Sequence, residues 1–199
     1  KNGYDIILHY SKSEEKAFSI KKDLEATYGV KVIPVKADLC SNDEIEALAQ
    51  KALSELGTID VLINNAGIAH QELFQLCSDE KAKEIFDVNI MSAMKLTKEI
   101  LPSMIKNHSG RIINISSIGG RSNRPVNVAY SASKAGVNGF SRGLAIELAP
   151  WNITVNTVAP GPIAAGMFVK ASKDPNYVPT PEEKKARESF NLERNRMDG

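Results

Sequence analysis

The chain alternates between short apolar runs and segments in which apolar residues return every three or four positions. The apolar runs predict strands over 4–10, 30–37, 59–65, 111–116 and 153–159. The helical spacing predicts helices over 13–29, 41–57, 79–107 and 127–149. Strand–helix–strand alternation favours a parallel sheet with helices on both faces. We therefore predict a single α/β domain over residues 1–199.

Capping residues mark the limits of the first two predicted helices. Ser13 is the expected N-cap of the first helix, and Gly29 is expected to end it. At the start of the second helix, Ser41 and Glu44 have the spacing of a capping box. In that motif each side chain accepts a hydrogen bond from the backbone amide of the other residue. Both pairs predict where the helices begin or end.

Other segments are expected to be less regular. The stretch 79–107 is long for one helix, and we expect a break near Asp87 and a bend at Pro102. The strand 59–65 is rich in isoleucine and valine, which predicts burial on both faces. Near its end the chain turns polar, and a last helix is predicted to start near residue 181.

The composition narrows the class of protein without assigning a function. The 199 residues are 42% hydrophobic, and Lys+Arg 25 against Asp+Glu 24 leaves a net charge of +1. This balance gives no broad attraction to nucleic acid or acidic membranes. Cys40 and Cys77 have no metal-like spacing, and no apolar run approaches the roughly 20 residues of a membrane span. We expect a cytoplasmic globular protein with free thiols and no metal.

The stretch "YSASK" places Tyr130 and Lys134 four positions apart on a predicted helix, one turn from each other on the same face. An ammonium group stabilises a neighbouring phenolate and makes the phenol a better proton donor. The pair is therefore a candidate general acid. Taken alone, the same spacing also fits an exposed helical turn.

Together with "YSASK" at 130–134, four other motifs occur along the chain. They are "NNAG" at 64–67, Asn89 in "DVNI", "NISS" at 114–117 and "PG" at 160–161. With these motifs the sequence resembles the short-chain dehydrogenase/reductase family over nearly its whole length. The resemblance implies a Rossmann-type doubly wound fold and a nicotinamide dinucleotide cofactor.

The resemblance also implies roles for four residues. Tyr130 would give the proton to a carbonyl oxygen, assisted by Lys134, which would also hold the cofactor ribose. The hydroxyl of Ser117 would bond the substrate carbonyl, and the spacing to Tyr130 favours Ser117 over its neighbour Ser116. Asn89 would hold a water that links Lys134 to solvent. Each residue also has a purely structural alternative, such as a serine that satisfies backbone groups at a strand end.

Cofactor contacts are implied at the strand ends. Asn65, Ala66 and Gly67 would lie beside the adenosine half, Asp38 and Leu39 at the adenine ring, and Pro160, Gly161 and Ile163 along the nicotinamide. Asp38 could instead be a loop carboxylate before a helix cap. Ala165 departs from the family pattern, which usually has a threonine there.

The stretch "HYSKS" at 9–13 bears on the choice of cofactor. NAD-preferring relatives usually carry an acidic residue there, and this chain has none. Ser11, Lys12 and Ser13 could hold a 2′-phosphate by charge and hydroxyl contacts. We therefore favour NADP(H), with NAD(H) possible. The alternative is that Lys12 is a solvated charge and Ser13 only a helix cap.

The resemblance also implies segments that this chain does not show. The family's first strand and the Gly-rich turn that holds the pyrophosphate would precede 4–10, and a last helix and strand would follow 196–199. Without that central strand, 4–10 and 59–65 would flank an empty slot with unpaired backbone groups. We therefore expect a Rossmann-type domain that is incomplete at both ends.

The substrate is the least determined feature. The run from Gly110 to 163 resembles 3-oxoacyl-[acyl-carrier-protein] reductases, which implies an acyl carrier protein as a possible partner. Those enzymes dock the carrier with basic residues, where this chain has His108, near Lys106, and Trp151. The charged segment 164–196 is expected to form a lid, which leaves a sugar, polyol or other small alcohol possible.

The family also forms dimers or tetramers through the outer faces of the helices at 79–107 and 127–149, so we expect a homo-oligomer. A protein of another class, a catalytically silent scaffold that binds a nucleotide or a protein, is the remaining alternative. Such a scaffold would be expected to lose Tyr130 or Lys134, and both are present.

Overall fold

The computed structural model describes residues 2–122 and 125–161. Its strands are β1 (Ile6–Tyr10), β2 (Val32–Lys36), β3 (Val61–Asn64), β4 (Gly110–Ile115) and β5 (Ile153–Val158). Its longer helices are α1 (Glu14–Tyr28), α2 (Asn42–Leu56), α3 (Asp79–Phe86), α4 (Ser92–Lys106) and α5 (Val128–Leu148). The predicted alternation of strands and helices is confirmed. Ile163, the expected lid at 164–196 and the helix near 181 lie outside the described residues.

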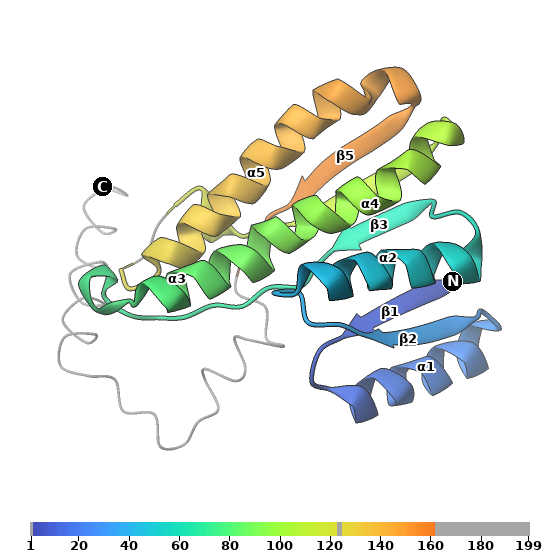
Figure 1. Cartoon of the computed structure of the whole chain (residues 1–199), viewed down its shortest axis with the longest axis horizontal. Coiled ribbons are helices and arrows are strands. Elements are labelled where there is room, and N and C mark those ends of the chain that lie inside the picture. The colour runs from blue at the N-terminus through green and yellow to red at the C-terminus, as the bar shows by residue number, and fades with distance from the viewer. Residues whose placement is uncertain (1, 123–124, 162–199) are drawn as a thin grey trace, which may run out of the picture.

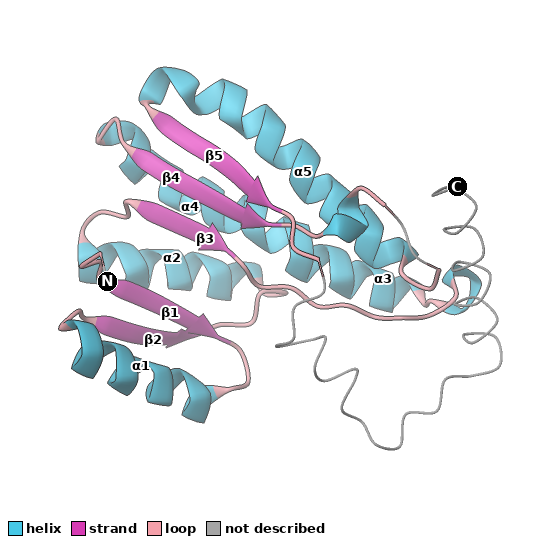
Figure 2. Ribbon diagram, turned by 180° about the vertical axis from the view of Figure 1, so that it is seen from behind, coloured by secondary structure: helices cyan, strands magenta, loops and turns pink. Residues whose placement is uncertain are grey.

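The strands form two parallel sheets. One pairs β1 with β2, and the other has the order β3–β4–β5. Figure 2 shows the arrows of both sheets pointing the same way, so the carboxyl ends of the strands lie on one side of the sheets. Among the described residues no ladder joins β1 to β3. This is the boundary at which the sequence predicts an empty slot between 4–10 and 59–65.

The hydrophobic core lies between the three-stranded sheet and the helices α2, α4 and α5. Its fully buried members are Ala49, Ile100, Met104, Ile112, Leu148, Ile153 and Val155. These residues come from α2, α4, β4, α5 and β5, so the three helices cover one face of this sheet (Figure 1). Helix α1 packs separately against β1 and β2.

Strand β3 is not buried on both faces, and that prediction was wrong. Leu62 packs against the core, but the side chain of Ile63 is 56% exposed. Successive side chains of a strand point to opposite faces, so Ile63 lies on the face away from α2 and α4. The apolar character of 59–65 predicts burial only if an element covers that second face.

The caps are partly as predicted. Gly29 ends α1 in the left-handed conformation, which confirms the prediction. The Ser41 hydroxyl accepts from the Glu44 amide (3.3 Å), but the Glu44 carboxylate accepts from the Asp38 amide (2.8 Å) rather than returning to Ser41. Ser13 occupies the N-cap position of α1 without a side-chain hydrogen bond. The capping box is therefore half formed, and the prediction of Ser13 as the N-cap residue is confirmed for its position but not for a side-chain cap.

The predicted break near Asp87 is a π-helical segment, Asp87–Met91, between α3 and α4. A π-turn contains one more residue than an α-turn, and such insertions often occur at functional sites. Asn89 lies at its centre and is buried. Pro102 remains within α4.

Candidate active site

The predicted site residues gather where the strands end. Parallel strands bring their carboxyl ends to one edge, where open α/β sheets bind ligands. In the described part of the chain, the predicted residues that lie one to three positions after the ends of β1 to β5 are Ser11 to Ser13, Asp38 and Leu39, Asn65 to Gly67, Ser117, and Pro160 and Gly161. Ile163 is not among the described residues.

The first turns of α5 carry Tyr130 and Lys134. The helix begins at Val128, and the Ser131 amide donates to the Asn127 carbonyl to close its first turn. The Lys134 ammonium lies 6.0 Å from the centre of the Tyr130 ring. The two side chains therefore lie together on one face of the helix, as the spacing predicts.

Lys134 is a buried cation held by a backbone group. Only 3% of the residue is exposed, and Nζ donates to the Ile115 carbonyl at the end of β4 (2.8 Å). Burial disfavours the charged form, and it lowers the pKa of Lys134 to about 8. Near neutral pH this lysine is still mostly charged, but it can release its proton more easily than a surface lysine.

The two serines that follow β4 have different partners. Ser116 is buried, and its hydroxyl donates to the Lys134 carbonyl (2.9 Å). Ser117 is partly exposed, and its hydroxyl accepts from the Gly119 amide (3.1 Å). A Cβ added to Gly119 would lie 3.4 Å from Ser117 Oγ and 3.5 Å from Cε1 of Tyr130. The Ser117 hydroxyl and the Tyr130 ring therefore lie close together beside Gly119.

Asn89 links the π-helix to the loop after β3. Its Oδ1 accepts from the Ile68 amide (2.7 Å), and its Nδ2 donates to the Ile68 carbonyl (2.9 Å) and to Ser133 Oγ (2.9 Å). Both Nδ2 hydrogens are therefore used within the protein. A Cβ added to Gly67 would lie 3.2 Å from Asn89 Oδ1 and 3.3 Å from Lys134 Nζ. The absence of a side chain at Gly67 lets the loop approach both groups.

The loop after β5 is tied to the loop after β4. The Pro160 carbonyl accepts from the Ile118 amide (3.1 Å), and a Cβ on Gly161 would lie 3.8 Å from Ile118 Cδ1. Pro160 and Gly161 thus adjoin the segment that carries Ser117.

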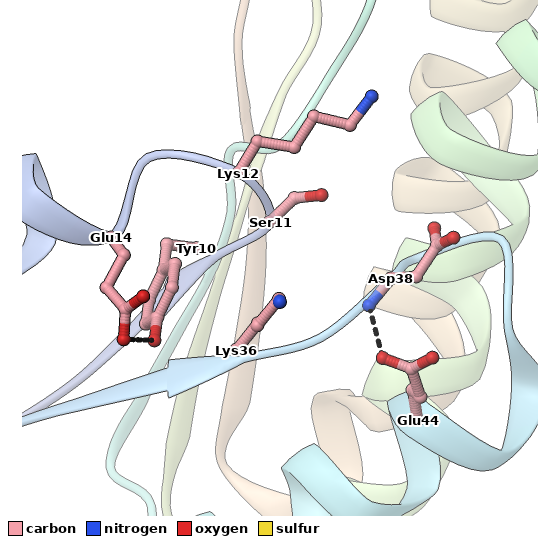
Figure 3. A pocket seen from close by; sticks show the side chains of 7 residues that line it. All are labelled: Tyr10, Ser11, Lys12, Glu14, Lys36, Asp38 and Glu44. Atoms are coloured by element: carbon pink, nitrogen blue, oxygen red, sulfur yellow. Dashed lines mark hydrogen bonds between the residues drawn. The ribbon is translucent and has the colours of Figure 1, made fainter.

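A cleft of about 650 Å³ opens beyond the ends of β1 and β2 (Figure 3). It is lined by Tyr10, Ser11, Lys12, Glu14, Lys36, Asp38 and Glu44. Three of the predicted cofactor residues, Ser11, Lys12 and Asp38, are in this lining, whereas Ser13 and Leu39 are not. The lining therefore contains two ammonium groups, of Lys12 and Lys36, and three carboxylates, of Glu14, Asp38 and Glu44.

Sequence reasoning missed some residues of the site. Tyr10 and Lys36 end neighbouring strands and are paired in register, so both reach the cleft. The rule that parallel strands end at one edge could have found Lys36, because 30–37 was already predicted as a strand. Ser133, which contacts Asn89, carried no signal beyond its place between Tyr130 and Lys134.

The residues present fit a nicotinamide dinucleotide at two places. In the cleft, Lys12, Lys36 and the Ser11 hydroxyl could hold a ribose or its phosphate, beside three carboxylates that would face its hydroxyls or the base. The bare backbone at Gly67, next to the Lys134 ammonium, permits close approach of a ligand. The pyrophosphate-binding turn that the family resemblance implies is not represented among the described residues.

His108 lies away from this arrangement, and His70 is paired with a carboxylate. The rings of His108 and Trp151 are 5.4 Å apart, just before β4 and β5 begin and therefore at the opposite end of these strands from Ser117. His70 pairs with the Glu72 carboxylate at 2.9 Å. The His108–Trp151 pair is therefore separated from Ser117 of the same chain by the full length of β4.

Within 2–122 and 125–161, no helix is both long and apolar enough to cross a lipid bilayer. The same residues contain no cluster of three or more histidine, cysteine, aspartate or glutamate side chains that could hold a metal ion. Cys40 and Cys77 are both free thiols.

Comparison with known proteins agrees with this geometry. A family model described as short chain dehydrogenase matches residues 1–176. The 3-oxoacyl-[acyl-carrier-protein] reductase FabG of Staphylococcus epidermidis is 34% identical over 172 residues, which are 86% of this chain and 70% of that protein. Nodulation protein G of Rhizobium meliloti is 45% identical over 141 residues, 71% of this chain and 57% of its own length.

A solved structure is similar as well. The acetoin dehydrogenase YohF of Salmonella typhimurium superposes with a TM-score of 0.79 at 32% sequence identity. The match covers 89% of this chain and 70% of that protein. The likeness supports a Rossmann-like parallel sheet flanked by helices.

Proposed function

This chain belongs to the short-chain dehydrogenase family, whose members are NAD(P)-dependent oxidoreductases, and we propose that it reduces the ketone of a 3-oxoacyl thioester with NADPH. The observation that carries the proposal is the meeting of Ser117, Tyr130 and Lys134 at one edge of the sheet. The similarity to a 3-oxoacyl-[acyl-carrier-protein] reductase supports the substrate class.

The bound nicotinamide would supply a hydride to the carbonyl carbon of the substrate. As negative charge grows on the carbonyl oxygen, the Tyr130 hydroxyl donates its proton to that oxygen. The Ser117 hydroxyl, on the same side of Gly119, hydrogen-bonds the carbonyl and orients it toward Tyr130. In the oxidation of an alcohol the same groups act in reverse, with the phenolate as base.

Lys134 stabilises the phenolate that Tyr130 leaves behind. Its ammonium lies near the ring and is screened from water, which strengthens its electrostatic effect. In this proposal Lys134 also bonds the cofactor ribose. Asn89 remains a candidate for the proton relay, but its Nδ2 hydrogens are already donated, so a water would bind at its Oδ1 or backbone carbonyl.

The cleft beside β1 and β2 supports NADPH as the preferred cofactor. Lys12 and Lys36 supply positive charge there, and Ser11 supplies a hydroxyl for a 2′-phosphate. Asp38 and Glu44 lie at the far side of the cleft and would face the adenine (Figure 3). The residues after β3, Asn65 to Gly67, would flank the adenosine ribose, and Pro160 and Gly161 the nicotinamide.

A homo-oligomer is part of the proposal. A Cβ on Gly136 would lie 2.7 Å from Ile90, whereas Gly139 and Gly143 have nothing within 4 Å of that position. Ile146, one turn further along α5, is 79% exposed. The outer face of α5 has no side chain at Gly139 and Gly143, which would permit close packing against a second copy of the chain. We further propose a cytoplasmic protein whose substrate is carried by an acyl carrier protein.

Reduction of a small hydroxyketone or diketone is the second candidate function. The structural similarity to an acetoin dehydrogenase favours it, because the same Tyr130 chemistry serves any carbonyl of suitable size. The two functions differ in the substrate and not in the catalytic groups.

A substrate panel tests the proposal. The complete gene product would be assayed with acetoacetyl thioesters, acetoin, diacetyl and simple sugars, each with NADPH and with NADH, by the loss of absorbance of the reduced cofactor. We expect the largest kcat/KM for the acetoacetyl thioester with NADPH. Preference for acetoin or a sugar would reject the thioester, and NADPH binding without turnover of any carbonyl would indicate a silent scaffold.

A further inference from the structure

Ser133 is a buried serine between Tyr130 and Lys134 that the proposed chemistry does not use. It is 0% exposed. Its hydroxyl donates to the carbonyl oxygen of Tyr130 (2.7 Å) and accepts from Nδ2 of Asn89 (2.9 Å). The side chain therefore connects the turn that carries both catalytic groups to the π-helix.

The direction of these bonds is determined by the chemistry of the groups. A serine hydroxyl has one hydrogen, and Ser133 gives it to the Tyr130 carbonyl, so it meets Asn89 only as an acceptor. Asn89 must then present Nδ2 to Ser133 and Oδ1 to the Ile68 amide. Only one assignment of donors and acceptors satisfies this network, and every member of it is buried or partly buried.

The network also reaches the space around Lys134. The Ile68 backbone that Asn89 binds directly follows Gly67, whose Cα faces both Asn89 Oδ1 and Lys134 Nζ. On the other side, Lys134 is tied to β4 through the Ile115 carbonyl. The first turns of α5 are thus connected on one side to β4 and, through Ser133 and Asn89, to the loop after β3.

We propose that Ser133 is a positioning residue whose hydroxyl, through the Asn89 amide, holds the turn carrying Tyr130 and Lys134 in register with the loop after β3. The inference rests on the proposed oxidoreductase function, since it assigns a role in that reaction. Ser133 does not touch substrate in this role. It acts through the Tyr130 carbonyl and through Asn89.

Ordinary helix structure is the competing explanation, because serines often bond a carbonyl of the preceding turn. The same helix contains a matched case. Ser141 is buried, donates to the Val137 carbonyl (2.7 Å) and accepts from Nδ2 of Asn114 (2.8 Å). Its chemistry equals that of Ser133, but it lies about 12 Å further along the helix and contacts neither Asn89 nor the Tyr130 turn.

The experiment compares Ser133→Ala with Ser141→Ala in the complete gene product. Each variant loses one buried hydroxyl and leaves one buried asparagine amide without its acceptor, so both are expected to lower Tm to a similar extent. We would measure Tm, the number of NADPH sites, the Kd of NADPH and the single-turnover rate of hydride transfer per bound NADPH.

For Ser133→Ala we expect that rate to fall about tenfold or more, with the Kd of NADPH changed less than about twofold. Ser141→Ala should keep the wild-type rate per site. Ser131→Ala is a second control, because the Ser131 hydroxyl is buried and has no hydrogen-bond partner within residues 2–122 and 125–161. Equal rates in Ser133→Ala and Ser141→Ala would overturn the proposal.

A double-mutant cycle identifies the route of the effect. If Ser133 acts through Asn89, then Ser133→Ala should change the rate less than about twofold in a protein that already carries Asn89→Ala. Multiplicative effects of the two substitutions would contradict that route. If Ser133→Ala does not fold, Ser133→Cys keeps a similar volume with weaker hydrogen bonds, and a wild-type rate in that variant would equally reject the inference.

Failure of the inference can be distinguished from failure of the proposed function. An active wild-type protein with an unaffected Ser133→Ala variant rejects the positioning role alone. A wild-type protein that binds NADPH but reduces no carbonyl rejects the function, and the role assigned to Ser133 is rejected with it.

Discussion

Around Lys134 the polar groups are buried and bonded to partners within the chain, whereas around Lys12 and Lys36 they line an open cleft with few mutual contacts. Lys134, Asn89, Ser116 and Ser133 each have assigned hydrogen bonds and little or no exposed surface. In the cleft, only the Tyr10–Glu14 bond and the Asp38–Glu44 bond join lining residues to one another (Figure 3).

The difference indicates that the two ends of the site work in different ways. A catalytic proton donor needs a fixed geometry, and buried hydrogen bonds supply it before a ligand arrives. A cleft of solvated charges binds by attraction and can tolerate rearrangement, at the cost of weaker discrimination. Substitutions near Lys134 should therefore alter chemistry more than binding, and substitutions in the cleft should alter binding more than chemistry.

Tyr130→Phe should give the largest effect. Removal of one hydroxyl takes away the proton donor, and we expect kcat to fall about a thousandfold, because a positioned general acid contributes on this scale. NADPH binding should be retained, which isothermal calorimetry can measure. Tyr28→Phe, at the exposed end of α1, is the matched control and should leave kcat unchanged. Turnover close to wild type in Tyr130→Phe would remove Tyr130 from the role of acid.

The pH dependence of stability tests the burial of Lys134. Its pKa is about 8 in the folded protein against the usual 10.5, so between these values the unfolded chain holds a proton that the folded chain has lost. Stability should therefore rise with pH in this window. Relative to Lys134→Met, the wild-type free energy of unfolding should increase by about 2 kcal/mol from roughly pH 7.5 to 9.5, as measured by urea titration.

A difference between wild type and Lys134→Met that does not change with pH would contradict this expectation. It would mean that the ammonium is hydrated in the folded protein, and the contrast between a buried and an open end of the site would be lost.

Lys36→Glu and Lys12→Glu should have the smallest effect and should act on binding. If these ammonium groups contact a 2′-phosphate, each substitution should weaken NADPH binding about tenfold and change NADH binding less than about twofold. Fluorescence titration with both cofactors measures the ratio. Lys98→Glu, on the exposed side of α4, is the control. An unchanged NADPH/NADH ratio in both cleft variants would exclude the two lysines as the phosphate contact.

The sequence predicted the elements well because the signals were local. Apolar spacing gave the strands and helices, and the four-residue spacing of "YSASK" placed Tyr130 and Lys134 together on α5. The spacing from Tyr130 favoured Ser117 over Ser116, and the structure leaves Ser117 as the more accessible hydroxyl. These features depend on residues a few positions apart.

The sequence failed where a tertiary contact decided the outcome. The Glu44 carboxylate bonds the amide of Asp38 instead of completing the capping box, because the loop after β2 brings that amide within reach. Ile63 is exposed because no described element covers its face of the sheet. Lys36 and Ser133 join the site through strand register and helix packing, which no short motif records.

The π-helix at Asp87–Met91 has a consequence for how this protein can vary. A π-turn holds one residue more than an α-turn. Removing that residue would rotate the following part of the helix by about 100° around the helix axis. Loss of a single residue there would swing the Asn89 amide away from Ile68 and Ser133 while leaving the composition almost the same. Chain length in this segment is therefore constrained together with the identity of Asn89, and insertions or deletions here should be rarer than substitutions at its other positions.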